Sequence, residues 1–222
     1  MTAPTDGALS LDGPGFKLNN LFPTPVAVAP VHDAEPLNQF LRTAILARRA
    51  ADGGVRRSNA GGWQSADDFA DWSGTHGARL MQLARGLADG LTGIETGSGL
   101  QRRPLDWKIN AWANVNGPGD GNHPHHHPGS FWSGVYWVDS GDDQASGTLG
   151  GELEMLDPRG VLPAFMAPSL RYAAPGCLSA GLSEFLSPRS GTMVLFPSWL
   201  VHAVRPYRGT AERISVAFNF AP

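Results

Sequence analysis

The sequence predicts an α+β domain with a β-sandwich or jelly-roll core and helices packed outside it. Two amphipathic helical patterns occupy the first part of the chain, and from Asp106 onward apolar residues recur at every second position instead. Helices followed by a run of strands are typical of an α+β fold. The 28 glycines and 18 prolines are spread along the chain as turn residues, which suits many short strands.

The composition favours a globular protein with neither a nucleic-acid nor a membrane partner. The 222 residues are 41% hydrophobic and 17% charged, with a formal charge of −3. No run of lysine and arginine exceeds two residues, and the longest apolar runs are strand-sized. Because the first residues lack signal-peptide features and Cys177 is the single cysteine, we expect a cytoplasmic protein. We expect residues 1–18 to form a flexible tail and residues 19–222 a single domain.

The first expected elements are a short strand and two helices. Residues 21–29 resemble a strand with proline at its start. Asp33 is placed to cap a helix that runs to about Arg49, and a second helix is expected from about Thr75 to Asp89, because apolar residues recur there at helical spacing.

The remaining elements are predicted strands. Alternation is clearest from Trp107 to Asn116, where every second residue is apolar. Further strands are expected at residues 133–138, 152–156, 192–196, 201–204 and 213–220. The one long gap, residues 157–189, is rich in proline, alanine and serine, and we expect no strand there.

The segment Asn122–Pro128 carries four histidines within five positions: His123, His125, His126 and His127. In an extended chain, His123, His125 and His127 share one side and His126 takes the other. Neutral imidazole is the commonest metal ligand in proteins, so the segment predicts a metal site. The alternative is a solvated polar loop.

His202 is the candidate distal partner of this cluster. It lies in an apolar strand, where a histidine is costly to bury without a partner. Arg213 and Ser215 follow in another apolar strand and face the same side of it. An arginine in that position favours a carboxylate, which is either a ligand or a protein acid such as Glu212 or Glu184.

These motifs together resemble a known family. His-x-His-Pro, then Ser-Gly-Val-Tyr, Gly-Gly-Glu-Leu, Pro-Ser-Trp-Leu-Val-His and Arg-Ile-Ser-Val-Ala-Phe-Asn follow one another from His125 to Asn219. In this order they are similar to bacterial and phage 2-oxoglutarate-dependent, non-haem iron(II) oxygenases, which are relatives of the prolyl 4-hydroxylases. The similarity extends upstream and leaves out only the N-terminal tail.

The resemblance implies a double-stranded β-helix, a cupin-like jelly roll, with Fe(II), 2-oxoglutarate and O2 at the site. By the resemblance, the metal ligands are His125, His127 and His202. Arg213 is implied to bind the C5 carboxylate of 2-oxoglutarate with the help of Ser215, and Tyr136 to offer its hydroxyl to the cosubstrate. The residues expected on the substrate side are Trp112, Asn114 and Asn116.

The proximal motif departs from the usual pattern of the wider superfamily, which is His-x-Asp or His-x-Glu. Here His127 stands where the acid is expected. Either the metal has a three-histidine triad, or a carboxylate comes from elsewhere; the candidates are Asp120, Glu152, Glu154 and Asp157. His123 remains an alternative to His127.

The predicted function is therefore a 2-oxoglutarate- and Fe(II)-dependent dioxygenase that hydroxylates a small-molecule or peptide substrate. A three-histidine cupin-type dioxygenase without 2-oxoglutarate is one alternative. A non-catalytic metal- or ligand-binding jelly roll is the other. A homodimer is the default expectation for the assembly.

Overall fold

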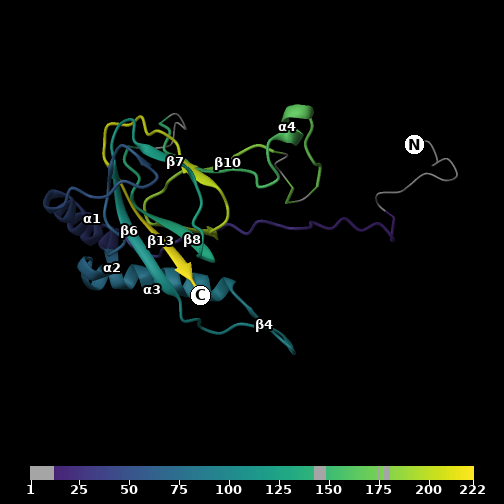
Figure 1. Cartoon of the computed structure of the whole chain (residues 1–222), viewed down its shortest axis with the longest axis horizontal. Coiled ribbons are helices and arrows are strands. Elements are labelled where there is room, and N and C mark those ends of the chain that lie inside the picture. Colours follow the sequence, from purple (N-terminus) through teal and green to yellow (C-terminus); the bar gives the residue numbers. More distant parts are fainter. Residues whose placement is uncertain (1–12, 143–148, 175, 178–180) are drawn as a thin grey trace.

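The alternating segments pair into two antiparallel sheets that face each other as a jelly roll, and helices cover the outer face of the larger sheet (Figure 1). The computed structural model describes residues 13–142, 149–174, 176–177 and 181–222. The predicted fold class is confirmed.

The larger sheet has six strands. In order across the sheet they are β1 (Ala27–Pro30), β11 (Thr192–Pro197), β8 (Trp132–Asp139), β13 (Arg213–Ala221), β6 (Lys108–Asn116) and β3 (Trp63–Gln64). The smaller sheet has five, in the order β10 (Glu184–Leu186), β9 (Leu153–Met155), β12 (His202–Val204), β7 (Gly121–His125) and β2 (Asn59–Ala60). A separate hairpin joins β4 (Ile94–Thr96) and β5 (Gly99–Gln101). The five predicted strands after residue 130 correspond to β8, β9, β11, β12 and β13.

Strand β13 separates the apolar core from the space between the sheets. It lies between β6 and β8. Val216 and Phe218 are fully buried in the same core as Leu41 of the first helix. Arg213 and Ser215 line a cavity between the sheets, as strand alternation predicts. The register of β13 against β8 shifts between Ile214 and Ser215, and such irregularities often re-aim side chains beside sites.

Two long helices confirm the predicted ones. They are α1 (Ala34–Ala51) and α3 (Gly74–Leu91), and the short α2 (Phe69–Trp72) precedes α3. Leu41 of α1 and Leu80 of α3 are fully buried against the larger sheet. Asp33 does precede α1, but its backbone is left-handed (φ 50°) and its side chain makes no capping hydrogen bond.

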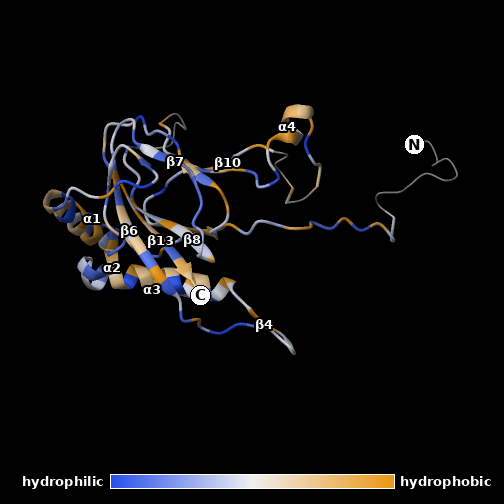
Figure 2. Ribbon diagram, viewed as in Figure 1, coloured by the Kyte–Doolittle hydropathy of each residue, from blue (hydrophilic) through white to orange (hydrophobic). Residues whose placement is uncertain are grey.

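Two segments differ from the sequence expectation. Residues 21–29 pair only from Ala27 onward, because Pro23 and Pro25 have no N–H to donate to a sheet. Residues 157–189 contain α4 (Leu162–Met166) as well as β10. Figures 1 and 2 show α4 as a hydrophobic helix that projects away from the sheets.

The described part of the N-terminal segment, from residue 13 onward, also extends away from the sheets (Figure 1). Residues 1–12 of the predicted tail lie outside the described residues, and residues 14–18 are exposed. The division into tail and domain therefore stays a prediction. Among the described residues, no helix is long and apolar enough to cross a membrane.

Candidate active site

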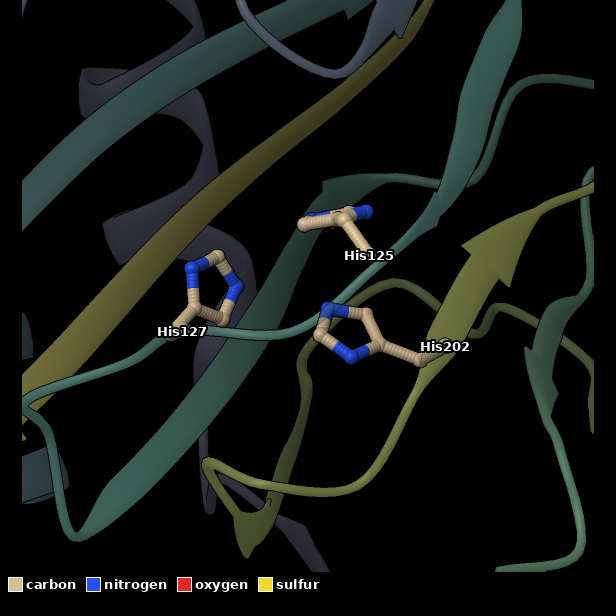
Figure 3. Close-up of side chains that lie close together, drawn as sticks. All are labelled: His125, His127 and His202. Atoms are coloured by element: carbon tan, nitrogen blue, oxygen red, sulfur yellow. The ribbon is translucent and has the colours of Figure 1, made fainter.

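Three histidines from neighbouring parts of the smaller sheet converge (Figure 3). Strand β7 ends at His125, β12 begins at His202, and the two strands pair with these residues in register. His127 follows shortly after β7, where its backbone N–H donates to the carbonyl of Ser198 over 3.0 Å. The ligand nitrogens of the three histidines lie within 4.8 Å of one another.

Two of the rings are oriented by a carbonyl two residues earlier in their own chain segment. His125 Nδ1 lies 2.7 Å from the carbonyl oxygen of His123, and His202 Nδ1 lies 2.9 Å from that of Leu200. Because a carbonyl can only accept, each Nδ1 carries the hydrogen and donates it. The lone pair is then on Nε2, as a metal ligand requires, and this carbonyl support is common around metal-bound histidine.

The surroundings keep the three imidazoles neutral. Burial lowers the pKa of His202 to about 3 and the pKa of His127 to about 4. Burial is also the main cause that lowers the pKa of His125. Because each pKa lies below the usual value, the rings are unprotonated at neutral pH and can bind a cation.

In the part of the chain that the structure describes, no carboxylate joins this group of ligand atoms. None of the four candidate acids, Asp120, Glu152, Glu154 and Asp157, belongs to it. Asp120 accepts from the backbone N–H of Gly117, and Asp157 binds Arg159. His123 and His126 are exposed and lie outside the group, so the geometry favours His127 over His123.

A cavity of about 730 Å³, its open mouth included, adjoins the histidines. Its lining includes the three residues predicted for the substrate side, Trp112, Asn114 and Asn116 of β6, together with Arg213 and Ser215 of β13. The residues of the two strands lie side by side, because Arg213 pairs with Asn116 and Ser215 with Asn114. The cavity lining therefore contains the candidate metal ligands on one side and polar side chains of β6 and β13 on another.

Arg213 is a buried cation that forms no hydrogen-bonded ion pair with an acid among the described residues. Its exposed fraction is 7%, and its Nε and Nη1 have no hydrogen-bond partner among the described residues. Glu212, one of the two acids considered for it, binds Arg49 instead. Burial lowers the pKa of Arg213 to about 10, against the opposing effects of Tyr207 and Glu152, so the group stays charged at neutral pH.

A buried charge without a partner is strongly destabilising. The unsatisfied donors of Arg213 in a cavity beside three neutral metal ligands therefore fit an anionic ligand, and a carboxylate matches the guanidinium fork. The residues present thus fit both a divalent metal and 2-oxoglutarate.

The predicted role of Tyr136 is corrected by the structure. Ser215 pairs with Trp137 and Val216 with Tyr136, so Tyr136 shares the helical face of the sheet and not the cavity face. Its side chain is fully buried, and its hydroxyl donates to Oδ1 of Asn38 in α1 over 2.6 Å. The hydroxyl therefore does not reach the cavity.

Sequence reasoning missed Ser58, Asn122, Gly151 and Tyr207. Ser58 Oγ lies 3.3 Å from His125 Nε2, and Asn122 donates to Ser58 Oγ over 3.2 Å. Ser58 arrives through the pairing of β2 with β7, which no local pattern announces. The signal for Gly151 is the Gly-Gly pair before β9.

Comparisons with known proteins agree with this chemistry. Residues 110–219 match the family described as "Putative 2OG-Fe(II) oxygenase". No curated protein sequence matches the chain. A Pseudomonas putida prolyl-4-hydroxylase structure is similar with a TM-score of 0.56 at 18% identity, covering 88% of this chain and 91% of that one.

Two further structures were solved with ligands. A Trichoplax adhaerens prolyl hydroxylase, in complex with a hypoxia inducible factor peptide fragment, has a TM-score of 0.58 at 12% identity and covers 88% of this chain and 83% of that one. HygX from Streptomyces hygroscopicus, with nickel, 2-oxoglutarate and hygromycin B bound, has a TM-score of 0.56 at 13% identity and covers 90% and 83%. At such identities the structures show a shared fold.

Proposed function

We propose that this chain, which belongs to the 2-oxoglutarate- and Fe(II)-dependent oxygenases, holds its iron with His125, His127 and His202 and with no carboxylate. The convergence of these three ligand atoms carries the proposal. The protein is an oxidoreductase whose cosubstrates are O2 and 2-oxoglutarate. When bound, iron and 2-oxoglutarate supply the oxidation of a substrate C–H bond by O2 together with the conversion of 2-oxoglutarate to succinate and CO2.

The metal-binding part of the proposal rests on neutral donors. Two rings present Nε2 because their Nδ1 hydrogens bind backbone carbonyls, and burial keeps all three unprotonated. Three neutral ligands leave the iron one negative charge short of the two-histidine, one-carboxylate arrangement. We therefore expect the bound anionic cosubstrate to contribute more to metal retention than it does in that arrangement.

The role proposed for Arg213 is to bind the C5 carboxylate of 2-oxoglutarate, with Ser215 beside it. The buried charge and the unpartnered Nε and Nη1 support this role, because a bound carboxylate neutralises the charge and gives the guanidinium an acceptor. An oxygenase that does not use a keto acid has no need of such a cation in its cavity.

For the substrate, we propose an uncharged polar small molecule or peptide segment that lies against Trp112, Asn114 and Asn116. Together with Ser58 and Asn122, these residues give the cavity wall hydrogen-bonding groups without charge. Among the structural neighbours, one binds a peptide fragment and another binds hygromycin B, so the fold accommodates both classes. The cytoplasmic location and the homodimer stay predictions from the sequence.

The proposal is tested by removing each candidate ligand in turn. Chains with His125→Ala, His127→Ala or His202→Ala are expected to lose Fe(II), measured as iron per chain after anaerobic loading and gel filtration. The matched controls Asp120→Asn, Glu152→Gln, Glu154→Gln and Asp157→Asn are expected to keep it and to form succinate. Loss of iron in any folded acid variant would show that a carboxylate completes the site.

A further inference from the structure

Arg213 is stabilised by an aromatic ring where a buried arginine usually has an acid. Its guanidinium carbon lies 5.1 Å from the centroid of the Tyr207 ring. A cation within about 6 Å of an aromatic face is attracted to it, and the attraction grows when the pair is desolvated. Arg213 is buried and Tyr207 is fully buried, so this pair is shielded from water.

Tyr207 is itself held by contacts on all of its polar atoms. Its hydroxyl accepts the backbone N–H of Asp142 over 2.9 Å and lies 3.3 Å from the carboxylate of Asp142, to which it donates. Its own backbone N–H donates to Asp120, and its carbonyl accepts from Gly119. The ring is therefore fixed before any ligand arrives.

Asp142, the acid that contacts the Tyr207 hydroxyl, forms its other hydrogen bonds with backbone groups and not with Arg213. The carboxylate of Asp142 accepts the backbone N–H groups of Thr210 and Ala211, and the hydrogen bond from Thr210 is the main cause that lowers its pKa. The negative charge is thus kept next to the phenol hydroxyl, whereas the guanidinium faces the ring. Burial raises the pKa of Tyr207, so the phenol stays neutral.

Gly151 completes the surroundings of the guanidinium. Its φ is +76°, and a Cβ atom at this position would collide with Nη1 of Arg213. Only bare backbone allows the guanidinium to lie there. The left-handed backbone conformation also favours glycine.

We propose that Tyr207 is a positioning residue for 2-oxoglutarate, which acts by holding the Arg213 cation with its ring face and leaving the guanidinium donors to the carboxylate of the ligand. A protein carboxylate beside Arg213 would stabilise the charge equally well, but it would occupy these donors and compete with the cosubstrate. The ring face attracts the cation and accepts none of its in-plane hydrogen bonds. The inference rests on the proposed function of Arg213.

The test compares Tyr207→Phe, which keeps the ring, with Tyr207→Leu, which removes it. Each chain is loaded with Ni(II), which prevents turnover, and titrated with 2-oxoglutarate by calorimetry. We expect Tyr207→Phe to bind 2-oxoglutarate within about threefold of the unchanged chain and Tyr207→Leu to bind it about tenfold more weakly. Ni(II) affinity is expected to be the same in all three, because the ring does not contact the histidines.

Alanine substitutions at Gly151 and Gly160 provide a second, independent test. Gly151→Ala is expected to weaken 2-oxoglutarate binding by at least about tenfold, since the guanidinium must move from its position. Gly160→Ala is the matched control, because Gly160 has a similar φ of +81° but nothing within 4 Å of an added Cβ. It carries the same backbone strain without the collision, and we expect normal binding.

The outcomes separate this inference from the proposed function. If the unchanged chain does not bind 2-oxoglutarate, or if Arg213→Ala binds it normally, the role of Arg213 is wrong. If Arg213→Ala loses binding while a Ni(II)-binding Tyr207→Leu chain keeps it, only the role of Tyr207 is overturned. Should Tyr207→Leu fail to fold, Tyr207→Met replaces it, because the flexible methionine side chain fills more of the ring volume. Weaker 2-oxoglutarate binding is again the expected result, and normal binding would again overturn the role of Tyr207.

Discussion

The two ends of the cavity are organised in different ways. At the metal end, His125 and His202 are each oriented by a carbonyl two residues earlier, so local chain geometry prepares the ligand. At the anion end, Arg213 has no such neighbour. The position of its guanidinium depends on the ring of Tyr207, on the backbone at Gly151 and on the pairing of β13 with β6.

This difference indicates which end of the cavity tolerates substitutions in the surrounding residues. The rings of His125 and His202 are oriented by their own chain segments, and the pairing of β7 with β12 brings the two together. A buried cation must be stabilised until its anion arrives, and this requires several distant segments. The metal end should therefore lose function only when a ligand itself is removed, whereas the anion end should respond to changes in residues around Arg213.

The largest effect is expected from His202→Ala. This chain should lose Fe(II)-dependent conversion of 2-oxoglutarate to succinate altogether, because the ligand that β12 contributes is gone. Succinate formation and bound iron are the measurements. His126→Ala is the control, since His126 is exposed and lies outside the group, and it should behave like the unchanged chain. Normal succinate formation by His202→Ala would contradict the site.

The choice between His127 and His123 gives the next largest effect. His127→Ala should weaken Fe(II) binding by at least about 100-fold, the upper end of the range for residues that merely support a metal site. His123→Ala should leave metal affinity unchanged, because His123 supports His125 through its backbone carbonyl. Competition with a metal-binding dye measures both affinities. The reverse result would exchange the two assignments.

At the anion end, Arg213→Ala should raise the KM for 2-oxoglutarate by about 10- to 100-fold, the loss expected for charge-assisted hydrogen bonds. Iron content should hardly change, which distinguishes this end from the metal end. Arg205→Ala, at an exposed arginine outside the cavity lining, is the control and should have a normal KM. Loss of iron in Arg213→Ala would place the arginine next to the metal instead.

The smallest effect concerns Tyr136. Tyr136→Phe should lower the free energy of unfolding by about 1 kcal/mol through loss of the hydrogen bond to Asn38, and leave the KM for 2-oxoglutarate unchanged. Urea unfolding and steady-state kinetics check the two parts. A raised KM would restore the cosubstrate role expected from the resemblance.

A pH titration of stability adds to this test. Burial raises the pKa of Tyr136 to about 12, above its unfolded value near 10. The unfolded chain therefore loses this proton first, so the contribution of Tyr136 is present below pH 10 and is lost as the pH rises toward 12. The fall in stability over that window should be smaller in Tyr136→Phe.

Much of this protein could be predicted because its signals are local. Period-two alternation located the long strands, and it placed Arg213 and Ser215 on the same face of β13. Alternation placed His123, His125 and His127 on one side, with His202 as the one other histidine of the strand region. The family resemblance then implied His125, His127 and His202, the group that the fold brings together. The exception is Tyr136, for which alternation leaves two faces open until a neighbouring strand sets the register.

The sequence by itself determined the jelly-roll class, the candidate ligands and the candidate anion-binding arginine, because residue type and periodicity act over a few neighbouring positions. Only the tertiary structure decided that no described carboxylate joins the histidines, that Tyr136 faces the helices, and that Tyr207 and Gly151 surround Arg213. These facts depend on strand pairing between residues far apart in the chain. No local pattern carries that information, since a shift of one residue in register exchanges the two faces of a strand.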